Sequence, residues 1–129
     1  MKRVITFGTF DLFHVGHLRI LERARSMGNC LIVGVSTDQL TLAKKGRLPV
    51  FGQEERLQII KALRVVDEAF LEESLAMKRG YIERHSATIL VMGDDWSGKF
   101  DDMKDRCEVV YLPRTPTIST TATIEKIRL

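Results

Sequence analysis

The chain has 129 residues, of which 44% are hydrophobic and 29% are charged, as is typical of a globular protein. The length predicts one domain over residues 1–129, and the lack of a long apolar run or a signal peptide predicts a cytoplasmic protein without a membrane partner. The net charge of +3 is modest and no basic stripe is present, so we expect a small anionic ligand rather than nucleic acid.

Five strand-like apolar runs alternate with helical patterns along the sequence. Strands are expected at residues 3–7, 30–35, 68–70, 88–92 and 108–112. Helices are expected at residues 15–27, 53–62 and 74–85, and from about Thr120. Gly28 and Asn29 are expected to close the first helix. This alternation predicts an α/β fold, with a Rossmann-like doubly wound parallel sheet of about five strands flanked by helices.

Loops that follow parallel strands should carry the functional residues. Right-handed crossovers place these loops along one edge of the sheet, where ligands bind in such folds. The loops after Phe7, Val35, Met92 and Leu112 are therefore expected to converge, and they hold nearly all the unusual residues. Residues 41–52 are the most loop-like segment and are expected to be the most mobile.

Residues 8–17 place two imidazoles, His14 and His17, where the first strand gives way to the first helix. A helix N-terminus has unpaired N–H groups and a partial positive charge, and therefore favours anions. Two histidine donors and the small Gly16 make this a pocket suited to polyphosphate. Zinc ligation is the competing interpretation, but a zinc site needs a third ligand, and the remaining histidine, His85, lies on a different predicted helix.

Three motifs carry a family resemblance that covers essentially the whole chain. GTFDLFHVGH at residues 8–17 resembles the extended HxGH signature of the nucleotidyltransferase superfamily, in its cytidylyltransferase form. MGDDWSGKFD at residues 92–101 resembles the loop of the branch that acts on glycerol 3-phosphate. Residues 114–121 resemble the family's RTxGISTT motif, except that Thr117 stands where the family usually has glycine. If that position requires φ > 0, the loop path is expected to differ.

The resemblance implies transfer of CMP from CTP to sn-glycerol 3-phosphate, which gives pyrophosphate and CDP-glycerol, a precursor of teichoic acid or a related polymer. It also implies Mg²⁺ bound with CTP, and a homodimer whose interface the sequence does not identify. Two alternatives stay open. One is a nucleotidyltransferase that uses ATP or another alcohol phosphate, and the other is a non-catalytic nucleotide sensor on the same scaffold.

Basic residues in two later segments are candidates for phosphate contacts. From the residues alone, Lys44 is a solvated charge in a basic loop, while Arg56 and Arg64 could serve helix charge patterning. The resemblance instead implies that Lys44, Arg56 and Arg64 bind the substrate. The catalytic residues that it implies are His14, His17, Lys44 and Arg114.

The nucleotide pocket is expected to draw on the loops after three strands. Its predicted residues are Thr9, Phe10, Asp11, His14, His17, Gly93, Asp94, Trp96, Arg114, Thr115, Ser119 and Thr120. Asp94 and Asp95 could orient a base or ribose or help to hold Mg²⁺, and Trp96 could form an apolar wall beside the nucleotide. Ser119 or Thr120 is also expected to cap the last helix.

Overall fold

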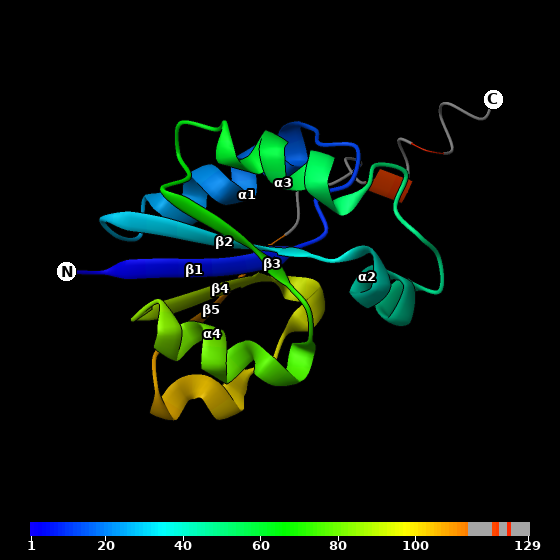
Figure 1. The fold of residues 1–129 in the computed structure, drawn as a ribbon. Coiled ribbons are helices and arrows are strands. Elements are labelled where there is room, and N and C mark those ends of the chain that lie inside the picture. Colours follow the sequence, from blue (N-terminus) through cyan, green and yellow to red (C-terminus); the bar gives the residue numbers. More distant parts are fainter. Residues whose placement is uncertain (114–119, 122–123, 125–129) are drawn as a thin grey trace.

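A computed structural model of the chain describes residues 1–113, 120–121 and 124 (Figure 1). Within this part, five parallel strands form one sheet in the order β3-β2-β1-β4-β5. The strands are β1 (Arg3–Gly8), β2 (Cys30–Ser36), β3 (Glu68–Glu72), β4 (Ile89–Gly93) and β5 (Glu108–Leu112). This sheet confirms the predicted α/β fold. None of the described helices is long and apolar enough to cross a membrane.

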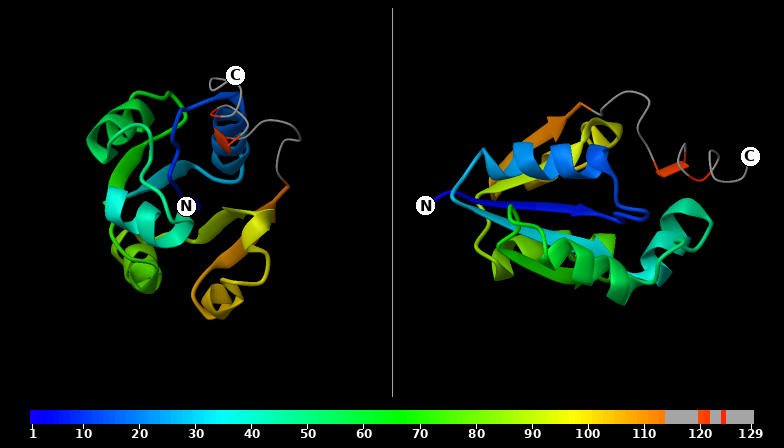
Figure 2. Two further views of the ribbon diagram at one scale, coloured as in Figure 1. Left: turned by 90° about the vertical axis from the view of Figure 1, so that its right-hand side faces the viewer. Right: turned by 90° about the horizontal axis from the view of Figure 1, so that it is seen from above.

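Helices cover both faces of the sheet. Figure 1 shows α1 (Val15–Arg25) and α3 (Gln53–Lys61) on one face and α4 (Lys78–Arg84) on the other. The short 3-10 helix η1 (Leu75–Met77) precedes α4, so the predicted helix at residues 74–85 is present in two parts. Helix α2 (Asp38–Lys45) covers neither face and lies beyond the carboxyl ends of the strands (Figures 1 and 2).

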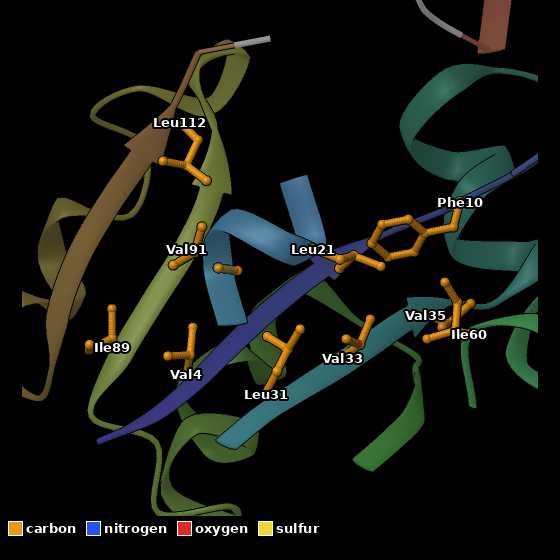
Figure 3. Packing of buried hydrophobic residues seen from close by; sticks show 11 residues of the cluster. Val4, Phe10, Leu21, Leu31, Val33, Val35, Ile60, Ile89, Val91 and Leu112 are labelled. Carbon is orange, nitrogen blue, oxygen red and sulfur yellow. The ribbon is translucent and has the colours of Figure 1, made fainter. Parts of the chain in front are cut away.

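The three central strands, β1, β2 and β4, are apolar because both of their faces are buried. Val4 and Val33 belong to the core cluster that also takes Leu21 from α1 and Ile60 from α3 (Figure 3). Ile5, the neighbour of Val4, belongs to the opposite cluster under α4. A strand buried on both sides reads as a continuous apolar run, which explains why the strands are easily predicted.

The topology creates a switch point beside β1. From β1 the chain builds β2 and β3 on one side and then crosses to build β4 and β5 on the other. β1 and β4 are hydrogen-bonded neighbours, with Thr6 opposite Val91. Ligands of open α/β sheets bind at the carboxyl ends of strands where the strand order reverses. The expected binding place is therefore the end of β1 and β4.

Helix α2 corrects the prediction that residues 41–52 form a loop. The Thr37 side chain caps the helix by accepting a hydrogen bond from the backbone N–H of Leu40 at 3.1 Å. Gly46 ends the helix in the left-handed conformation with φ of 74°. A hydroxyl cap followed nine residues later by glycine is an ordinary helix signature, but the eight-residue helix between them has a weak apolar pattern. Only residues 46–52 form the connecting loop.

The predicted C-cap of the first helix is also wrong. Helix α1 ends at Arg25, and Ser26 follows it in the right-handed conformation. Gly28 does not adopt positive φ. A Cβ at Gly28 would lie 2.5 Å from the carbonyl oxygen of Lys2, so glycine is needed here for close packing of two backbone segments rather than for a left-handed turn.

Candidate active site

A cavity of about 690 Å³ opens at the carboxyl ends of β1 and β4, over the start of α1. The predicted residues that line it are Thr9, Phe10, His14, His17, Lys44, Gly93, Trp96 and Thr120. The other described lining residues are Thr6, Phe7, Gly8, Gly16, Ile20, Lys45, Arg47, Met92, Asp95 and Thr121. The structure therefore brings most of the described candidates into one place, at the switch point.

His14 and His17 cap the start of α1 reciprocally. Nδ1 of His14 accepts a hydrogen bond from the backbone N–H of Gly16 at 3.0 Å, and Nδ1 of His17 accepts one from the backbone N–H of His14 at 3.2 Å. A capping box usually employs serine or threonine with glutamate, whereas here two imidazoles take both positions. Because each Nδ1 is an acceptor, each neutral ring carries its proton on Nε2.

The two imidazoles are neutral at physiological pH. Burial, together with the nearby His14 and Lys45, lowers the pKa of His17 to about 3. Burial also lowers the pKa of His14. The two rings stack with their centroids 3.8 Å apart, a contact that two positively charged rings would disfavour. Each histidine is therefore a neutral N–H donor.

The Nε2 atoms of the two rings have different surroundings. Nε2 of His17 lies 3.4 Å from Oγ1 of Thr120, and this hydroxyl donates to the carbonyl oxygen of Asp11 at 2.9 Å. Nε2 of His14 is buried and has no hydrogen-bond partner within the described residues. A buried donor without an acceptor is costly, and such groups are often completed by a ligand. The His14 ring thus presents a donor suited to an anionic oxygen.

The turn between β1 and α1 is strained and packs against the histidines. Phe10 and Leu12 adopt positive φ values of 55° and 49°. Such a conformation costs a non-glycine residue roughly 1 kcal/mol or more. A Cβ at Gly8 would lie 2.9 Å from the Phe10 ring, so Gly8 makes room for it. The Phe10 ring in turn packs edge-on against His17, with the centroids 5.6 Å apart.

Asp11 lies outside the cavity lining, contrary to its predicted contact with nucleotide. It is 5% exposed, and its carboxylate accepts hydrogen bonds from the backbone N–H groups of Val50 and Phe51 at 2.6 and 2.9 Å. These bonds tie the loop at residues 46–52 to the start of α1. Asp11 therefore has a structural role, in which it holds the loop at residues 46–52 beside the start of α1.

Arg56 is likewise buried and hydrogen-bonded to other protein groups, and it does not line the cavity where the predicted phosphate contact would lie. It is 1% exposed, and Nε donates to the carbonyl oxygen of Phe51. Nη1 donates to the carbonyl oxygens of Thr9 and Ser36, and Nη2 donates to the Asp38 carboxylate, each at 2.8 Å. With these donors satisfied, Arg56 holds together the loops that follow β1 and β2.

Two further predicted residues are placed differently by the structure. Arg64 is exposed in the turn between α3 and β3, which leads into the amino end of β3, at the sheet edge opposite the cavity. Asp94 begins the 3-10 helix η2 (Asp94–Trp96), but its neighbour Asp95, and not Asp94, lines the cavity. A 3-10 turn rotates consecutive side chains by about 120°, so only one of two adjacent carboxylates faces inward.

Several predictions fall on residues that the structure does not describe. Arg114, Thr115, Thr117 and Ser119 lie outside the described residues. Sequence reasoning left Lys45 and Arg47 out of the site, although the basic run at residues 44–47 signals a cationic wall. Nη2 of Arg47 donates to Oγ1 of Thr121 at 3.2 Å, which joins the loop after α2 to the described part of the C-terminal segment.

Lys44 lies in the last turn of α2 rather than in a loop. Its Nζ donates to Oγ of Ser36 at 2.8 Å. Burial lowers the pKa of Lys44 to about 8, and the Glu72 carboxylate opposes that shift. Lys44 is therefore a partly desolvated cation at the cavity wall, where its attraction for a phosphate is stronger than in water.

The described residues contain no group of three or more His, Cys, Asp or Glu side chains that could hold a metal ion. The zinc interpretation of the histidine pair requires such a third ligand. Within the described part of the chain, the cavity instead offers neutral N–H donors from α1 and cations from α2 and the loop after it. This combination suits a polyphosphate.

The five-stranded sheet, with two imidazoles that cap a helix at its switch point, defines an α/β domain suited to a phosphorylated ligand. The family model described as cytidylyltransferase-like matches residues 5–127, so the chain belongs to the cytidylyltransferase-like family.

Individual relatives and a solved structure agree with this family. The chain is 50% identical to the glycerol-3-phosphate cytidylyltransferase of Bacillus subtilis (strain 168), over 98% of each chain. It is 30% identical to the FAD synthase of Thermococcus sibiricus, over 97% of this chain and 91% of that relative. A lipopolysaccharide core biosynthesis protein from Thermoplasma volcanium GSS1 superposes with a TM-score of 0.76 at 27% identity, over 89% of this chain and 98% of that one.

Proposed function

We propose that this chain is an enzyme that transfers CMP from CTP to sn-glycerol 3-phosphate and releases pyrophosphate. The observation that carries the proposal is the buried Nε2–H donor of His14, which lacks an acceptor within the described residues and lines the switch-point cavity. The 50% identity to a glycerol-3-phosphate cytidylyltransferase supports CTP and glycerol 3-phosphate as the substrates. The product would be CDP-glycerol, a building block for teichoic acid or a related polymer.

The reaction is a single in-line displacement. A phosphate oxygen of glycerol 3-phosphate forms a bond to the α-phosphorus of CTP, and the bond from that phosphorus to the bridging oxygen breaks. Negative charge grows on the α-phosphate and on the departing pyrophosphate. His14 and His17 donate Nε2–H hydrogen bonds to these oxygens. Because both rings are neutral, they act as fixed donors and not as acids.

The cations of the cavity offset the charge of two phosphorylated substrates. Lys44, Lys45 and Arg47 line the side of the cavity that faces α2. We assign Lys44 to the acceptor phosphate and propose that Arg114 contacts the triphosphate. Two anions repel each other on approach, and cations at fixed positions remove this barrier without having to reorganise.

The nucleotide is proposed to lie along the ends of β1 and β4. Thr9, Phe10, Gly93 and Trp96 line this part of the cavity, and Trp96 offers an aromatic surface. Mg²⁺ is proposed to enter as a complex with the triphosphate. The described residues contain no group of three or more His, Cys, Asp or Glu side chains, so the triphosphate itself would supply oxygens to the ion. A homodimer and a cytoplasmic location complete the proposal, and sedimentation of the purified chain tests the first.

Product analysis tests the proposal directly. The purified chain is offered CTP or ATP with a panel of phosphorylated alcohols that includes glycerol 3-phosphate, and products are identified by mass spectrometry. The expected result is CDP-glycerol with release of pyrophosphate. Preference for ATP would favour an adenylyltransferase, an alternative that the 30% identity to an FAD synthase keeps relevant. Nucleotide binding without turnover across the whole panel would instead indicate a sensor.

A further inference from the structure

A line of buried polar groups runs from the cavity wall toward the opposite face of the sheet. Nζ of Lys44 donates to Oγ of Ser36 at 2.8 Å, and this hydroxyl lies 3.3 Å from Oε1 of Glu72, to which it donates. Oε2 of Glu72 pairs with Nζ of Lys78 at 2.7 Å. Ser36 and Glu72 are the last residues of β2 and β3 and stand opposite each other in the sheet.

The members of this line other than Lys44 are almost fully enclosed. Ser36 and Glu72 are 0% exposed and Lys78 is 1% exposed. Nζ of Lys78 also lies 3.8 Å from the centroid of the Phe7 ring. Burying a carboxylate and an ammonium is costly even when they pair, and a hydrophobic pair would often be as stable. Neither Ser36 nor Glu72 lines the cavity, so no substrate contact explains them.

One carboxylate thus serves two ammonium groups in different ways. Lys78 forms a direct ion pair with Glu72, whereas Lys44 is connected to Glu72 through the hydroxyl of Ser36. An ammonium has three N–H donors, and within the described residues Ser36 takes one from Lys44. The Ser36 hydroxyl therefore links the Lys44 ammonium to the Glu72 carboxylate.

We propose that Glu72, acting through Ser36, is a positioning residue that keeps Lys44 charged and directed toward the substrate phosphate. This inference rests on the proposed function in one respect, which is that Lys44 binds the acceptor phosphate. Glu72 itself touches no substrate. Its role is to counter the loss of hydration that Lys44 suffers at the cavity wall, while its direct pair with Lys78 limits how strongly it attracts Lys44.

The charged groups around Lys44 fix the expected direction. Burial lowers its pKa to about 8, Glu72 on β3 raises it, and Lys45 on α2, Lys78 on α4 and Arg56 on α3 lower it by smaller amounts than the Glu72 charge raises it. Loss of the Glu72 charge must therefore lower the pKa of Lys44. Lys44 would then be largely neutral in the weakly alkaline range, where it is still half charged in the native protein.

Direct titration of Lys44 is the primary test. Lysine side chains labelled with ¹³C are followed by NMR against pH, and the Lys44 signal is assigned by its loss in Lys44→Arg. We expect a midpoint near 8 in the native chain and one lower by about half a pH unit or more in Glu72→Gln. The matched control is Glu68→Gln, the same change at the exposed amino end of β3, which should leave the midpoint in place.

Two further variants keep the test decisive if Glu72→Gln fails to fold because Lys78 is left unpaired. Glu72→Gln combined with Lys78→Met removes both buried charges, and the midpoint is again expected below that of the native chain, because Glu72 has the larger effect on Lys44. Ser36→Ala keeps both charges and removes the hydroxyl, so it should lower the midpoint by less. A midpoint that is unchanged or raised when the Glu72 charge is removed would overturn the proposal.

Kinetics then connect the charge of Lys44 to the reaction. The pH profile of kcat/KM for glycerol 3-phosphate is expected to fall on its alkaline side, and this fall should move to lower pH in Glu72→Gln together with the NMR midpoint. At pH 8 the variant should show a KM for glycerol 3-phosphate about twofold or more above native, because a midpoint lower by about half a pH unit halves the charged fraction of Lys44, and kcat should change less. An alkaline fall that stays in place would contradict the positioning role. Absence of turnover in the native chain would reject the proposed function, while the NMR titration would still decide whether Glu72 sets the charge of Lys44.

Discussion

The start of α1 and helix α3 both carry side chains that the sequence predicts to bind phosphate, but the structure uses them in opposite ways. At the start of α1, backbone N–H groups occupy the Nδ1 atoms of both histidines; Nε2 of His14 has no described partner, and Nε2 of His17 lies 3.4 Å from Oγ1 of Thr120. In α3, the Arg56 guanidinium is buried and donates to three carbonyl oxygens and to the Asp38 carboxylate.

Proximity to the cavity and positive charge therefore do not by themselves identify a ligand-binding residue. Arg56 is 1% exposed, does not line the cavity and has four of its five N–H donors bonded within the protein, whereas the neutral His14 has a donor in the cavity without a described acceptor. The distinction rests on whether the protein already satisfies the hydrogen-bonding capacity of the group. The two helices can therefore be distinguished by experiment. Substitution of Arg56 should lower the stability of the fold, whereas substitution of His14 should lower turnover.

The largest expected effect is on folding. Arg56→Met leaves three carbonyl oxygens and the Asp38 carboxylate without their donor, and we expect a loss of about 3 to 5 kcal/mol in the free energy of unfolding. Urea denaturation measures this loss. Arg64→Met is the matched control, because Arg64 is exposed, and it should change stability by no more than about 0.5 kcal/mol. If Arg56→Met kept native stability and only raised KM, Arg56 would be a ligand and the contrast would fail.

The next largest effect is on turnover. We expect His14→Ala and His17→Ala to lower kcat by about 10²- to 10³-fold, because each removes a donor to the transition state. CTP affinity should stay near native, and the free energy of unfolding should fall by only about 1 kcal/mol for the lost cap. His85→Ala, which alters the histidine outside the cavity, should leave kcat unchanged. Native turnover in either variant at the helix start would remove that histidine from the mechanism.

An intermediate effect is expected on the acid stability of the fold. The pKa of His17 is about 3 in the folded chain and about 6.5 when unfolded, so between these values the unfolded chain binds more protons. This contribution to stability is complete above pH 6.5 and is lost as pH falls toward 3, by at most about 1.4 kcal/mol per pH unit. Denaturation at pH 7 and pH 5 should show a smaller drop in His17→Asn than in the native chain. Equal drops would mean that His17 titrates normally.

The smallest expected effect concerns the loop at residues 46–52. Asp11→Ala removes the acceptor of two backbone N–H groups that water can partly replace, so we expect a loss of about 1 to 2 kcal/mol. Hydrogen exchange should become faster at the amides of Val50 and Phe51, and KM should rise more than kcat falls. Unchanged exchange at both amides would show that Asp11 does not hold this loop.

The fold was largely predictable because its central strands are buried on both faces and its histidine motif begins a helix. The α2 helix was not, since eight residues with a basic end give too weak a periodic signal. The directions in which individual side chains point could also not be predicted from the sequence. Lys44 and Arg56 are both basic residues after the second strand, and only the packing of loops around Thr9 and Ser36 decides which of them turns inward.

The state of the histidine pair when CTP binds is the most direct test of the account. Its central claim is that neutral imidazoles at the start of α1 donate from Nε2 to the α-phosphate of CTP. ¹⁵N NMR of labelled histidine should find both rings neutral and protonated on Nε2 at pH 7 to 8, and His17 should still be neutral at about pH 5. Addition of CTP should shift the Nε2 resonance of His14 and slow the exchange of its proton. A proton on Nδ1, or a His14 signal that CTP leaves unchanged, would contradict the account.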